Sequence, residues 1–277
     1  MAIKSIPIVS IIMPTYNGAN FIATSIQSVL DQSFENWELL IFDDESTDNT
    51  RIIIDAYAQK DPRIHILRTL QKKYTTGARN HCIKYAKWYY ICLLDHDDTW
   101  LNSDKLKKQL DYMMAHLSIG VCGTNYQIID QDGVNRWSKK LPKNDAEIKA
   151  NILLYSPFVP CSVMIKKQLF DQYGYFDPLY DKVDDYEIWL RFGRYTDYYN
   201  LPEYLVGYRI HTDNTSFQWK NMWKMKWYDL QLTWKYRTDY PMTLKSIMLK
   251  LVVIIIPYEF LLKNVKMIEI IKLLSRV

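Results

Sequence analysis

Four short apolar runs alternate with helix-like stretches along the first hundred residues. The runs have the length of strands and are nearly continuous, at 8–13, 38–42, 64–67 and 90–94. Strands that are covered on both faces have this composition, as in a parallel sheet. The stretches between them, 20–30, 47–58 and 76–87, are long enough for crossover helices. This order predicts an α/β fold with an open, mostly parallel sheet and right-handed crossovers.

The pattern loosens after residue 98. Helices are predicted at 105–116, 142–155 and 184–195, strands at 120–129 and 162–166, and a turn at 131–133. From residue 217 onward the pattern is almost wholly helical, with Pro241 and Pro257 as breaks. We therefore predict three parts, which are 1–104, 105–216 and a helical extension at 217–277.

Charge is divided unevenly along the chain. Residues 213–277 include eleven Lys or Arg and five Asp or Glu, a net charge of +6, whereas residues 1–212 are at −2. The net charge of the whole chain, +4, is small for a dedicated nucleic-acid-binding protein. An acidic body with a basic, apolar tail favours an enzyme core with a surface-docking appendage.

Cysteine use and the start of the chain favour the cytoplasm. The four cysteines form no CxxC pair, which disfavours a zinc site and predicts free thiols in a reducing compartment; they are Cys82, Cys92, Cys122 and Cys161. Residues 1–10 lack the apolar core of a signal peptide. The longest charge-free apolar stretch, 251–258, is far shorter than the roughly 20 residues of a spanning helix.

Two acids follow the second apolar run directly. Asp43 and Asp44 are therefore predicted at the carboxyl end of a core strand, which is the ligand crevice of open α/β sheets. A carboxylate there can accept a hydrogen bond from the N3 imide of a uracil ring. Alternatively, Asp44 or Ser46 caps the helix that begins near Thr47.

A second acidic cluster, Asp95-His96-Asp97-Asp98, follows the fourth run. In extended backbone, Asp95 and Asp97 would face the same side and raise each other's pKa unless a cation lies near them. Hard oxygen ligands favour Mg²⁺ or Mn²⁺, completed by waters and substrate phosphates. The alternative is an acidic turn in a solvated loop.

A third acidic pair, Asp184-Asp185, opens a predicted helix. Acids in the first turn are favoured by the helix dipole, and that alone could explain the pair. The functional alternative is that one acid is a general base facing a substrate hydroxyl.

Two single residues are weaker candidates. Arg79 follows a polar loop and opens a helix, where it could bind a phosphate or sugar oxygen or form a surface ion pair. His211 could ligate a metal or contact a diphosphate, or be an ordinary loop histidine.

Aromatic and basic residues alternate in the tail. Their near-helical spacing suits a membrane interface, where rings lie at headgroup depth and cations meet anionic lipid. The alternative is that the aromatic residues pack on the main domain. The residues are Trp219, Trp223, Trp227 and Trp234, with Lys220, Lys224 and Lys226 between them.

Taken in order, five motifs over about residues 7–216 resemble the family 2 glycosyltransferases with the GT-A fold. They are Val9 to Asn17 (VSIIMPTYN), Asp43 to Asp48 (DDESTD), Gly77 to Asn80 (GARN), Asp95 to Asp98 (DHDD), and Asp184-Asp185 with Trp189 and Arg191. The resemblance implies inverting transfer of a sugar from a nucleotide diphosphate, by family habit UDP, to an acceptor hydroxyl. It also implies a divalent metal, Mn²⁺ or Mg²⁺.

The resemblance also assigns roles. For the nucleoside, Thr15 and Tyr16 would frame the nucleobase, Asp43 would bind it, and Arg79 would lie nearby. Asp95 would hold the ribose or metal-bound water, and Asp97 would ligate the metal, with His211 as a further candidate ligand. Asp185 would be the general base. Two departures stand out. Asp184 replaces a usual Glu, which leaves the choice between Asp184 and Asp185 open, and Glu45 replaces a usual Gly. Because an ordinary Asp has a pKa of about 3.9, proton transfer is expected late in the reaction.

The same resemblance extends to partners and location. Residues 1–104 would form the nucleotide-sugar-binding half and 105–216 the acceptor-binding half. The acceptor would be a glycan or a polyprenyl-diphosphate-linked glycan in capsule or O-antigen synthesis, at the inner face of the plasma membrane. Two alternatives are a catalytically inactive nucleotide-binding or membrane-scaffolding protein, and a metal-dependent phosphohydrolase or nucleotidyltransferase.

Overall fold

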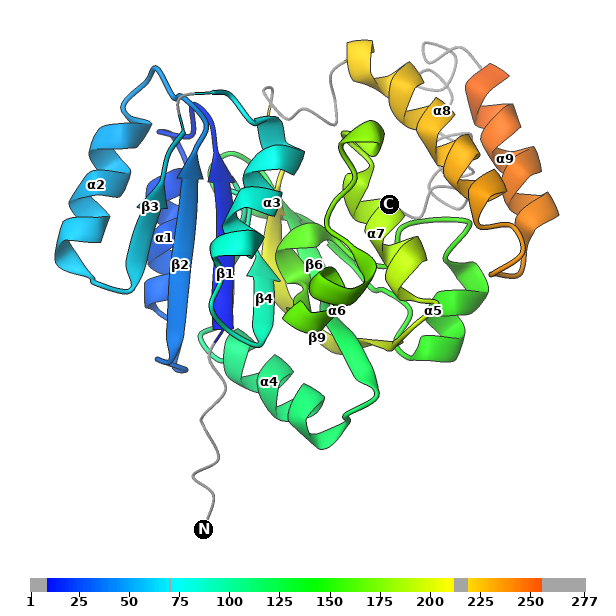
Figure 1. Ribbon diagram of the computed structural model, residues 1–277, viewed down its shortest axis with the longest axis horizontal. Coiled ribbons are helices and arrows are strands. Elements are labelled where there is room, and N and C mark those ends of the chain that lie inside the picture. The colour runs from blue at the N-terminus through cyan, green and yellow to red at the C-terminus, as the bar shows by residue number, and fades with distance from the viewer. Residues whose placement is uncertain (1–8, 70, 212–218, 256–277) are drawn as a thin grey trace.

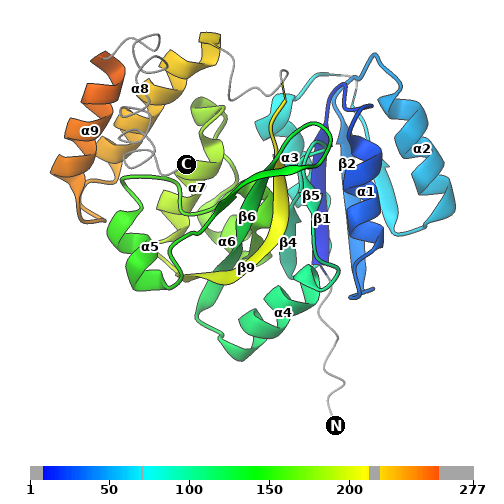
Figure 2. The ribbon, with the colours of Figure 1, turned by 180° about the vertical axis from the view of Figure 1, so that it is seen from behind.

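The computed structural model describes residues 9–69, 71–211 and 219–255. Its first half is the predicted alternation of strands and helices. The strands are β1 (Val9–Thr15), β2 (Trp37–Asp43), β3 (Ile64–Leu67) and β4 (Tyr90–Leu93), and the helices between them are α1 (Ile22–Leu30), α2 (Thr50–Lys60) and α3 (Tyr74–Tyr85). The four strands pair in parallel in the order β3-β2-β1-β4. Helix α3 covers one face of this sheet and α1 the other (Figures 1 and 2).

The second half extends the same sheet by strands of mixed direction. Beyond β4 the order is β8-β6-β9-β5, with β7 paired to the outside of this path. Only the β6–β9 pair is parallel among these additions. The strands are β5 (Thr99–Trp100), β6 (Ile119–Ile129), β7 (Asn135–Lys139), β8 (Met164–Lys166) and β9 (Asp197–Arg209). The fold is therefore the predicted mixed, mostly parallel α/β sheet, and the two predicted halves share it.

Several predicted boundaries in this half are corrected. The helix expected at 142–155 is limited to α5 (Asp145–Asn151), because the Asn144 side chain caps it by accepting a hydrogen bond from the backbone N–H of Glu147. The helix expected at 184–195 ends earlier, as α7 (Asp184–Phe192). The remaining helices are α4 (Lys105–Ala115), α6 (Lys167–Tyr173) and two short 3₁₀ segments at Pro160–Ser162 and Pro178–Tyr180.

Two apolar clusters, one on each face of the sheet, form the core. Alternate residues of the central strands divide between them, so that Ile11 and Met13 of β1 enter one cluster and Ile12 enters the other. The strands are buried on both faces, which explains their continuous apolar composition. All four cysteines are buried and free, as predicted.

Between residues 219 and 255, the described part of the C-terminal extension forms two helices, α8 (Trp219–Lys235) and α9 (Thr243–Ile255), and the predicted break at Pro241 lies between them. Leu232, Tyr236 and Tyr240 join the core cluster that contains α7. The Tyr240 hydroxyl donates to the carbonyl of Leu190 at 2.7 Å. One face of the extension thus packs on the main domain, but through these residues and not through the tryptophans. Trp223, Trp227 and Trp234 are exposed, so the interpretation that they pack on the main domain is wrong. Pro257 and the side chain of Trp219 lie outside the described residues.

Within the described ranges, no helix has both the length and the hydropathy needed to cross a bilayer. The domain boundaries at 104/105 and 216/217 remain predictions.

Candidate active site

The candidate residues gather at the carboxyl ends of β1, β2 and β4. Thr15 and Asp43, the last residues of β1 and β2, are register partners. The chain that leaves β4 stays beside β1, since the backbone N–H of Leu94 donates to the carbonyl of Ile12. This edge is where ligands bind in open α/β sheets.

Asp43 lies at this edge with its carboxylate already engaged. It accepts hydrogen bonds from the backbone N–H of Ser46 at 3.0 Å and from Arg51 Nε at 2.8 Å, and Arg68 Nε lies 3.7 Å away. The side chain of Asp43 has no exposed surface. A nucleobase can therefore reach this carboxylate only if Arg51 turns away.

Asp44 holds the start of α3. Its two carboxylate oxygens accept hydrogen bonds from the backbone N–H groups of Lys73 at 2.6 Å and Tyr74 at 2.8 Å. The expectation that Asp44 or Ser46 caps the helix near Thr47 is thus wrong. The N-cap of α2 is Asn49, whose side chain makes no capping hydrogen bond, and the preceding Asp48 accepts from the backbone N–H of Thr50 at 3.0 Å.

Glu45 follows with a φ of 67°, in the left-handed region. Glycine adopts this conformation without steric cost, whereas a residue with a side chain is strained in it.

Thr15 and Tyr16 are adjacent at this edge but differ in solvent exposure. Thr15 is buried, and its Oγ1 has no hydrogen-bond partner. Tyr16 is partly exposed, and Lys72 Nζ lies 3.3 Å from the centre of its ring. Lys72 was not predicted, and the only signal in the sequence is the pair Lys72-Lys73 ahead of α3.

The acidic segment after β4 is a turn and not an extended chain. The strand ends at Leu93, and the backbone N–H of Asp98 donates to the carbonyl of Asp95 at 3.2 Å. The prediction that Asp95 and Asp97 share one face of a strand is therefore wrong. Each of the two carboxylates instead meets its own cationic or ionisable partner.

Asp97 meets His211, which β9 carries to this edge. The His211 Nε2 lies 3.1 Å from Asp97 Oδ2, and both side chains are mostly buried. Two residues that the sequence separates by more than a hundred positions are thus adjacent, and both were predicted as metal ligands.

Asp98 and Arg209 hold the turn at 95–98 in place through hydrogen bonds. Neither was predicted as a site residue. Asp98 accepts a hydrogen bond from the backbone N–H of Arg209 at 2.9 Å. The Arg209 guanidinium donates back to the carbonyls of Asp97 at 2.8 Å and Asp130 at 2.9 Å. Burial and then the neighbouring Asp97 raise the pKa of Asp98 well above its ordinary value.

Arg79 joins the turn to α7. It contacts both carboxylate oxygens of Asp95, at 2.7 and 2.9 Å, and lies 3.7 Å from Asp184. Burial alone would lower the pKa of this guanidinium, but Asp95 and Asp184 raise it above the ordinary value. Arg79 is therefore neither a free phosphate ligand nor part of a surface ion pair in this structure, because it is buried between two acids.

The acids that open α7 differ from each other. Asp184 is buried and accepts a hydrogen bond from Thr76 Oγ1 at 2.8 Å. Asp185 is partly exposed and forms no ion pair with the described residues. Burial and then Asp184 raise the pKa of Asp185 to about 7, although Arg79 opposes the shift. The expectation of an ordinary carboxylate pKa is therefore wrong, and Asp185 is suited to accept a proton near neutral pH.

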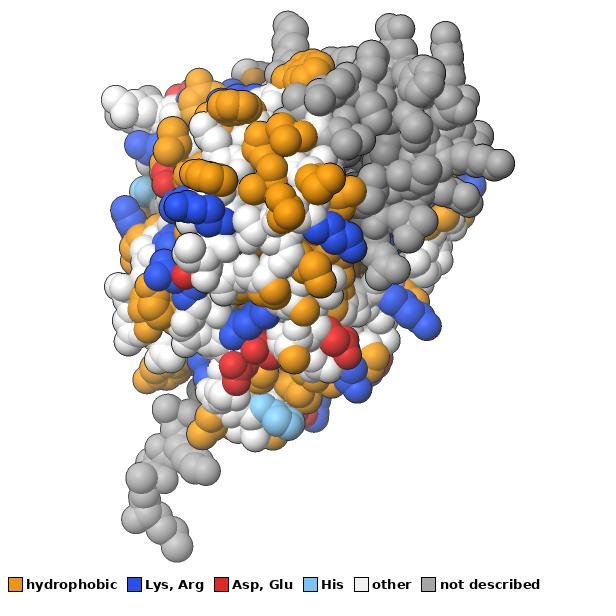
Figure 3. All heavy atoms as spheres, turned by 90° about the vertical axis from the view of Figure 1, so that its right-hand side faces the viewer, with side chains coloured by type: hydrophobic (Ala, Val, Ile, Leu, Met, Phe, Trp, Pro, Cys, Tyr) orange, Lys and Arg blue, Asp and Glu red, His pale blue; other side chains and the backbone are white. Residues whose placement is uncertain are grey.

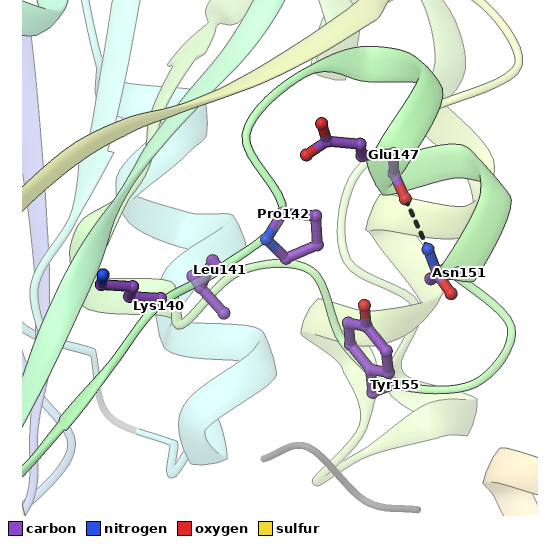
Figure 4. Close-up of a pocket in the computed structure, with 6 residues that line it drawn as sticks. All are labelled: Lys140, Leu141, Pro142, Glu147, Asn151 and Tyr155. Atoms are coloured by element: carbon purple, nitrogen blue, oxygen red, sulfur yellow. Dashed lines mark hydrogen bonds between the residues drawn. The ribbon is translucent and has the colours of Figure 1, made fainter. Parts of the chain in front are cut away.

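Two further observations concern possible metal and ligand sites among the described residues. No group of three or more His, Cys, Asp or Glu in the described part of the chain is arranged to hold a metal by itself. A surface pocket of about 310 Å³ lies between the segment after β7 and α5, lined by Lys140, Leu141, Pro142, Glu147, Asn151 and Tyr155 (Figure 4). None of the predicted site residues lines this pocket.

The sequence is similar to a known family and to named bacterial proteins. Residues 10–174, more than half of the chain, match the model of glycosyl transferase family 2. TuaG of Bacillus subtilis (strain 168), named for teichuronic acid biosynthesis, is 42% identical over 127 residues, which are 46% of this chain and 50% of TuaG. WfgD of Escherichia coli, named a UDP-Glc:alpha-D-GlcNAc-diphosphoundecaprenol beta-1,3-glucosyltransferase, is 37% identical over 184 residues, which are 66% of this chain and 68% of WfgD. The matched part of the chain thus spans only half the length of TuaG.

Solved structures with similar folds are more distant in sequence. TarS of S. aureus, residues 1–349 in complex with UDP, aligns with a TM-score of 0.61 at 18% identity and covers 81% of this chain and 65% of that one. The mannosyltransferase PcManGT from Pyrobaculum calidifontis, in complex with GDP-Man and Mn²⁺, aligns with a TM-score of 0.67 at 17% identity and covers 89% and 69%. At these identities the similarity is one of fold.

Proposed function

The chain belongs to glycosyltransferase family 2, and from this premise we propose that it transfers a sugar from a UDP-sugar, with inversion, to a hydroxyl of a lipid-linked glycan in the synthesis of a cell-surface polysaccharide. The donor and the acceptor class are supported by the name of WfgD, which specifies UDP-Glc and a diphosphoundecaprenol-linked sugar. The polysaccharide context is supported by the name of TuaG. We expect the enzyme to work in the cytoplasm at the inner face of the plasma membrane.

The observation that carries the proposal is the state of Asp185. The residue is partly exposed at the first turn of α7, its carboxylate has no ion-pair partner among the described residues, and its pKa is raised to about 7. A base whose pKa lies near the working pH combines a large ionised fraction with real proton affinity.

The proposed reaction places the proton on Asp185. The acceptor oxygen attacks the anomeric carbon from the face opposite the departing nucleoside diphosphate, and its proton passes to the Asp185 carboxylate. The bond from the anomeric carbon to the phosphate oxygen breaks, and the electron pair leaves with UDP. Asp184 is the positioning residue, since its carboxylate is committed to Thr76 and faces Arg79.

Asp97 and His211 are the residues that would hold a divalent cation. A carboxylate and an imidazole in contact fit Mn²⁺ or Mg²⁺ bound mainly through substrate phosphates, which is how such ions often bind in transferases. When bound, the ion stabilises the charge that develops on the departing diphosphate. Arg209 keeps Asp97 in place through the backbone of the turn.

The rest of the donor would lie along the carboxyl edge of β1 and β2. Tyr16 offers an exposed ring for the nucleobase, and Thr15 offers a buried hydroxyl that lacks a partner. Asp43 would accept the base N–H once Arg51 turns away. Asp95 would reach the ribose while Arg79 holds its carboxylate.

The test is a panel of UDP-, GDP- and dTDP-linked sugars, incubated with and without Mn²⁺ and scored for release of the nucleoside diphosphate. We expect metal-dependent release from a UDP-sugar, and a new glycosidic bond of inverted configuration when a diphosphoprenyl-linked sugar is added. Formation of free sugar phosphate without a glycosidic bond would instead indicate a phosphohydrolase. Absence of turnover with every donor would leave only a binding protein.

A further inference from the structure

The extension has two apolar faces, of which only one is buried. On α8, Leu232 and Tyr236 are buried against the main domain. Trp223, Trp227 and Trp234 are 55, 56 and 59% exposed. At 3.6 residues per turn, the three tryptophans fall within about 40° of one another, on the side of α8 opposite Leu232. A face of three exposed tryptophans is not explained by packing.

Helix α9 repeats this arrangement. Ser246 is buried and donates to the carbonyl of Leu153. Leu244, Met248 and Leu251 are exposed and fall on the opposite side of the helix. We call these three residues and the three tryptophans of α8 the exposed apolar face. Figure 3 views the molecule from this side and shows hydrophobic side chains gathered over the extension, with Lys and Arg side chains among them.

The two helices are held firmly to each other and to α7. Lys250 Nζ contacts Asp229 at 2.7 Å and the Thr233 hydroxyl at 2.6 Å. Glu187, two residues after Asp185, accepts a hydrogen bond from the Tyr236 hydroxyl at 2.7 Å and lies 3.3 Å from Lys235 Nζ. The exposed apolar face therefore belongs to a unit that is packed directly on the helix of the proposed base.

The charge of the two helices that carry this face is mainly positive. Residues 219–255 contain seven Lys or Arg and two Asp or Glu. Both acids are in ion pairs, Asp229 with Lys250 and Asp239 with Arg194. Lys224 and Lys245 are exposed. The surface that surrounds the tryptophans is therefore basic.

We propose that the exposed apolar face docks in the headgroup region of an anionic lipid bilayer and holds α7 next to a lipid-linked acceptor. Tryptophan rings prefer this depth of a membrane, and basic residues beside them are attracted to anionic headgroups. The acceptor part of this inference rests on the proposed function. The docking part rests on the exposed face and its charge alone.

The experiment is co-sedimentation of the full chain with vesicles, in the absence of any sugar donor. The vesicles are phosphatidylethanolamine with anionic phosphatidylglycerol, and phosphatidylcholine alone as the neutral comparison. We expect binding to the anionic vesicles that weakens with salt. The triple variant Trp223→Ser, Trp227→Ser, Trp234→Ser should bind at least about tenfold more weakly, since it loses most of the apolar area available for insertion.

A matched control exists elsewhere on the chain. Trp137 of β7 is 60% exposed, against 56% for Trp227. Trp227→Ser should weaken binding several-fold, and Trp137→Ser should leave it unchanged. Release of nucleoside diphosphate from the donor, measured without vesicles, should be normal in all of these variants, which shows that they fold.

Three results overturn the docking proposal. These are wild-type binding by the triple variant, absence of wild-type binding to anionic vesicles, and self-association of the wild-type chain that the triple variant abolishes. The last result would identify a second copy of the chain as the occupant of the face. Donor turnover without vesicle binding refutes docking alone, whereas vesicle binding without turnover refutes the proposed reaction alone.

Discussion

The carboxyl edge of the sheet, here called the donor edge, carries two pairs of adjacent aspartates, Asp43-Asp44 and Asp97-Asp98, and the first turn of α7 carries one, Asp184-Asp185, yet the two regions use them differently. At the donor edge Asp43 is paired with Arg51, and Asp97 is paired with His211. On α7, Asp185 forms no ion pair with the described residues. A carboxylate that contacts a basic side chain can serve as a ligand when that partner moves, whereas a carboxylate that has no such partner and lies beside another acid gains proton affinity.

A second comparison concerns the neighbour in each pair. Asp44 holds the start of α3, Asp98 holds the backbone of Arg209, and Asp184 holds Thr76. In every pair one acid is thus committed to the scaffold, and the other contacts a basic side chain, as Asp43 and Asp97 do, or has no ion-pair partner among the described residues, as Asp185 does. The difference between the regions therefore lies in the partner of this second acid, and the following substitutions test it.

The largest effect is expected from Asp185→Asn, which removes the unpaired carboxylate. Transfer should fall by about 10²–10⁴-fold, the usual contribution of a general base, while UDP affinity remains. Rates of transfer and calorimetric titration with UDP measure the two quantities. Asp171→Asn, an exposed acid on α6, is the control and should behave as the wild type. Normal turnover by Asp185→Asn would remove the residue from this role.

The same variant should be more stable than the wild type. Because the pKa of Asp185 is raised to about 7, above its unfolded value of about 3.9, the folded chain binds this proton more tightly. Ionised Asp185 therefore costs folding free energy above about pH 7, and this cost disappears as the pH falls toward 3.9. Asparagine removes the cost, so we expect a higher Tm above about pH 7. An unchanged or lower Tm contradicts the raised pKa.

Asp97→Ala, at the donor edge, should weaken donor binding, whereas Asp185→Asn should slow transfer and leave UDP binding intact. We expect the increase in UDP affinity that Mn²⁺ provides to fall by about 10–100-fold, with the metal-free affinity unchanged. Titrations with and without Mn²⁺ measure this, and Asp132→Ala, on an exposed turn, is the control. If Mn²⁺ still strengthens UDP binding to the wild-type extent, Asp97 is not a ligand.

The sequence could predict where the acids lie but not what they contact. The apolar runs fixed the parallel strands, and each acid placed directly after a run does lie at the carboxyl edge. Their partners could not be predicted, because Arg51, His211 and Arg209 reach the site through contacts that depend on the folded sheet. The turn at 95–98 was misread as extended because its closing hydrogen bond leaves no pattern in the sequence.

The long strand β9 was missed for a similar reason. Its residues, Asp197–Arg209, include Pro202 and polar residues on both faces, and its pairing with β6 is interrupted by register shifts. Without an alternating pattern, nothing local marked it as a strand. Since β9 leads to both Arg209 and His211, the contacts that these residues make with the turn could not be predicted before the sheet was assembled, although His211 itself was predicted as a candidate metal ligand.

Asp184→Asn should change the pKa of Asp185 while leaving the Asp185 carboxylate in place. The charge of Asp184 raises the pKa of Asp185, so the neutral amide should lower that pKa and move the acidic limb of the pH–rate profile below about pH 7. The amide oxygen can still accept the hydrogen bond of Thr76. A profile of kcat against pH, with Asp171→Asn alongside, measures the shift. A limb that stays in place shows that Asp185 is not the titrating group.

The smallest effect should come from the backbone, and it should be alike in the two regions. Glu45, after the donor pair, has a φ of 67°, and Lys182, before the α7 pair, has a φ of 78°. A residue with a side chain in this left-handed backbone conformation loses roughly 1–2 kcal/mol of folding free energy. Glycine removes this strain, but its greater backbone freedom stabilises the unfolded state and cancels part of the improvement. Glu45→Gly and Lys182→Gly should each raise the free energy of unfolding by about 0.5–1 kcal/mol in urea titrations. If only one of them does, the other side chain makes contacts that offset the strain, and the two loops do not hold their acids in the same way.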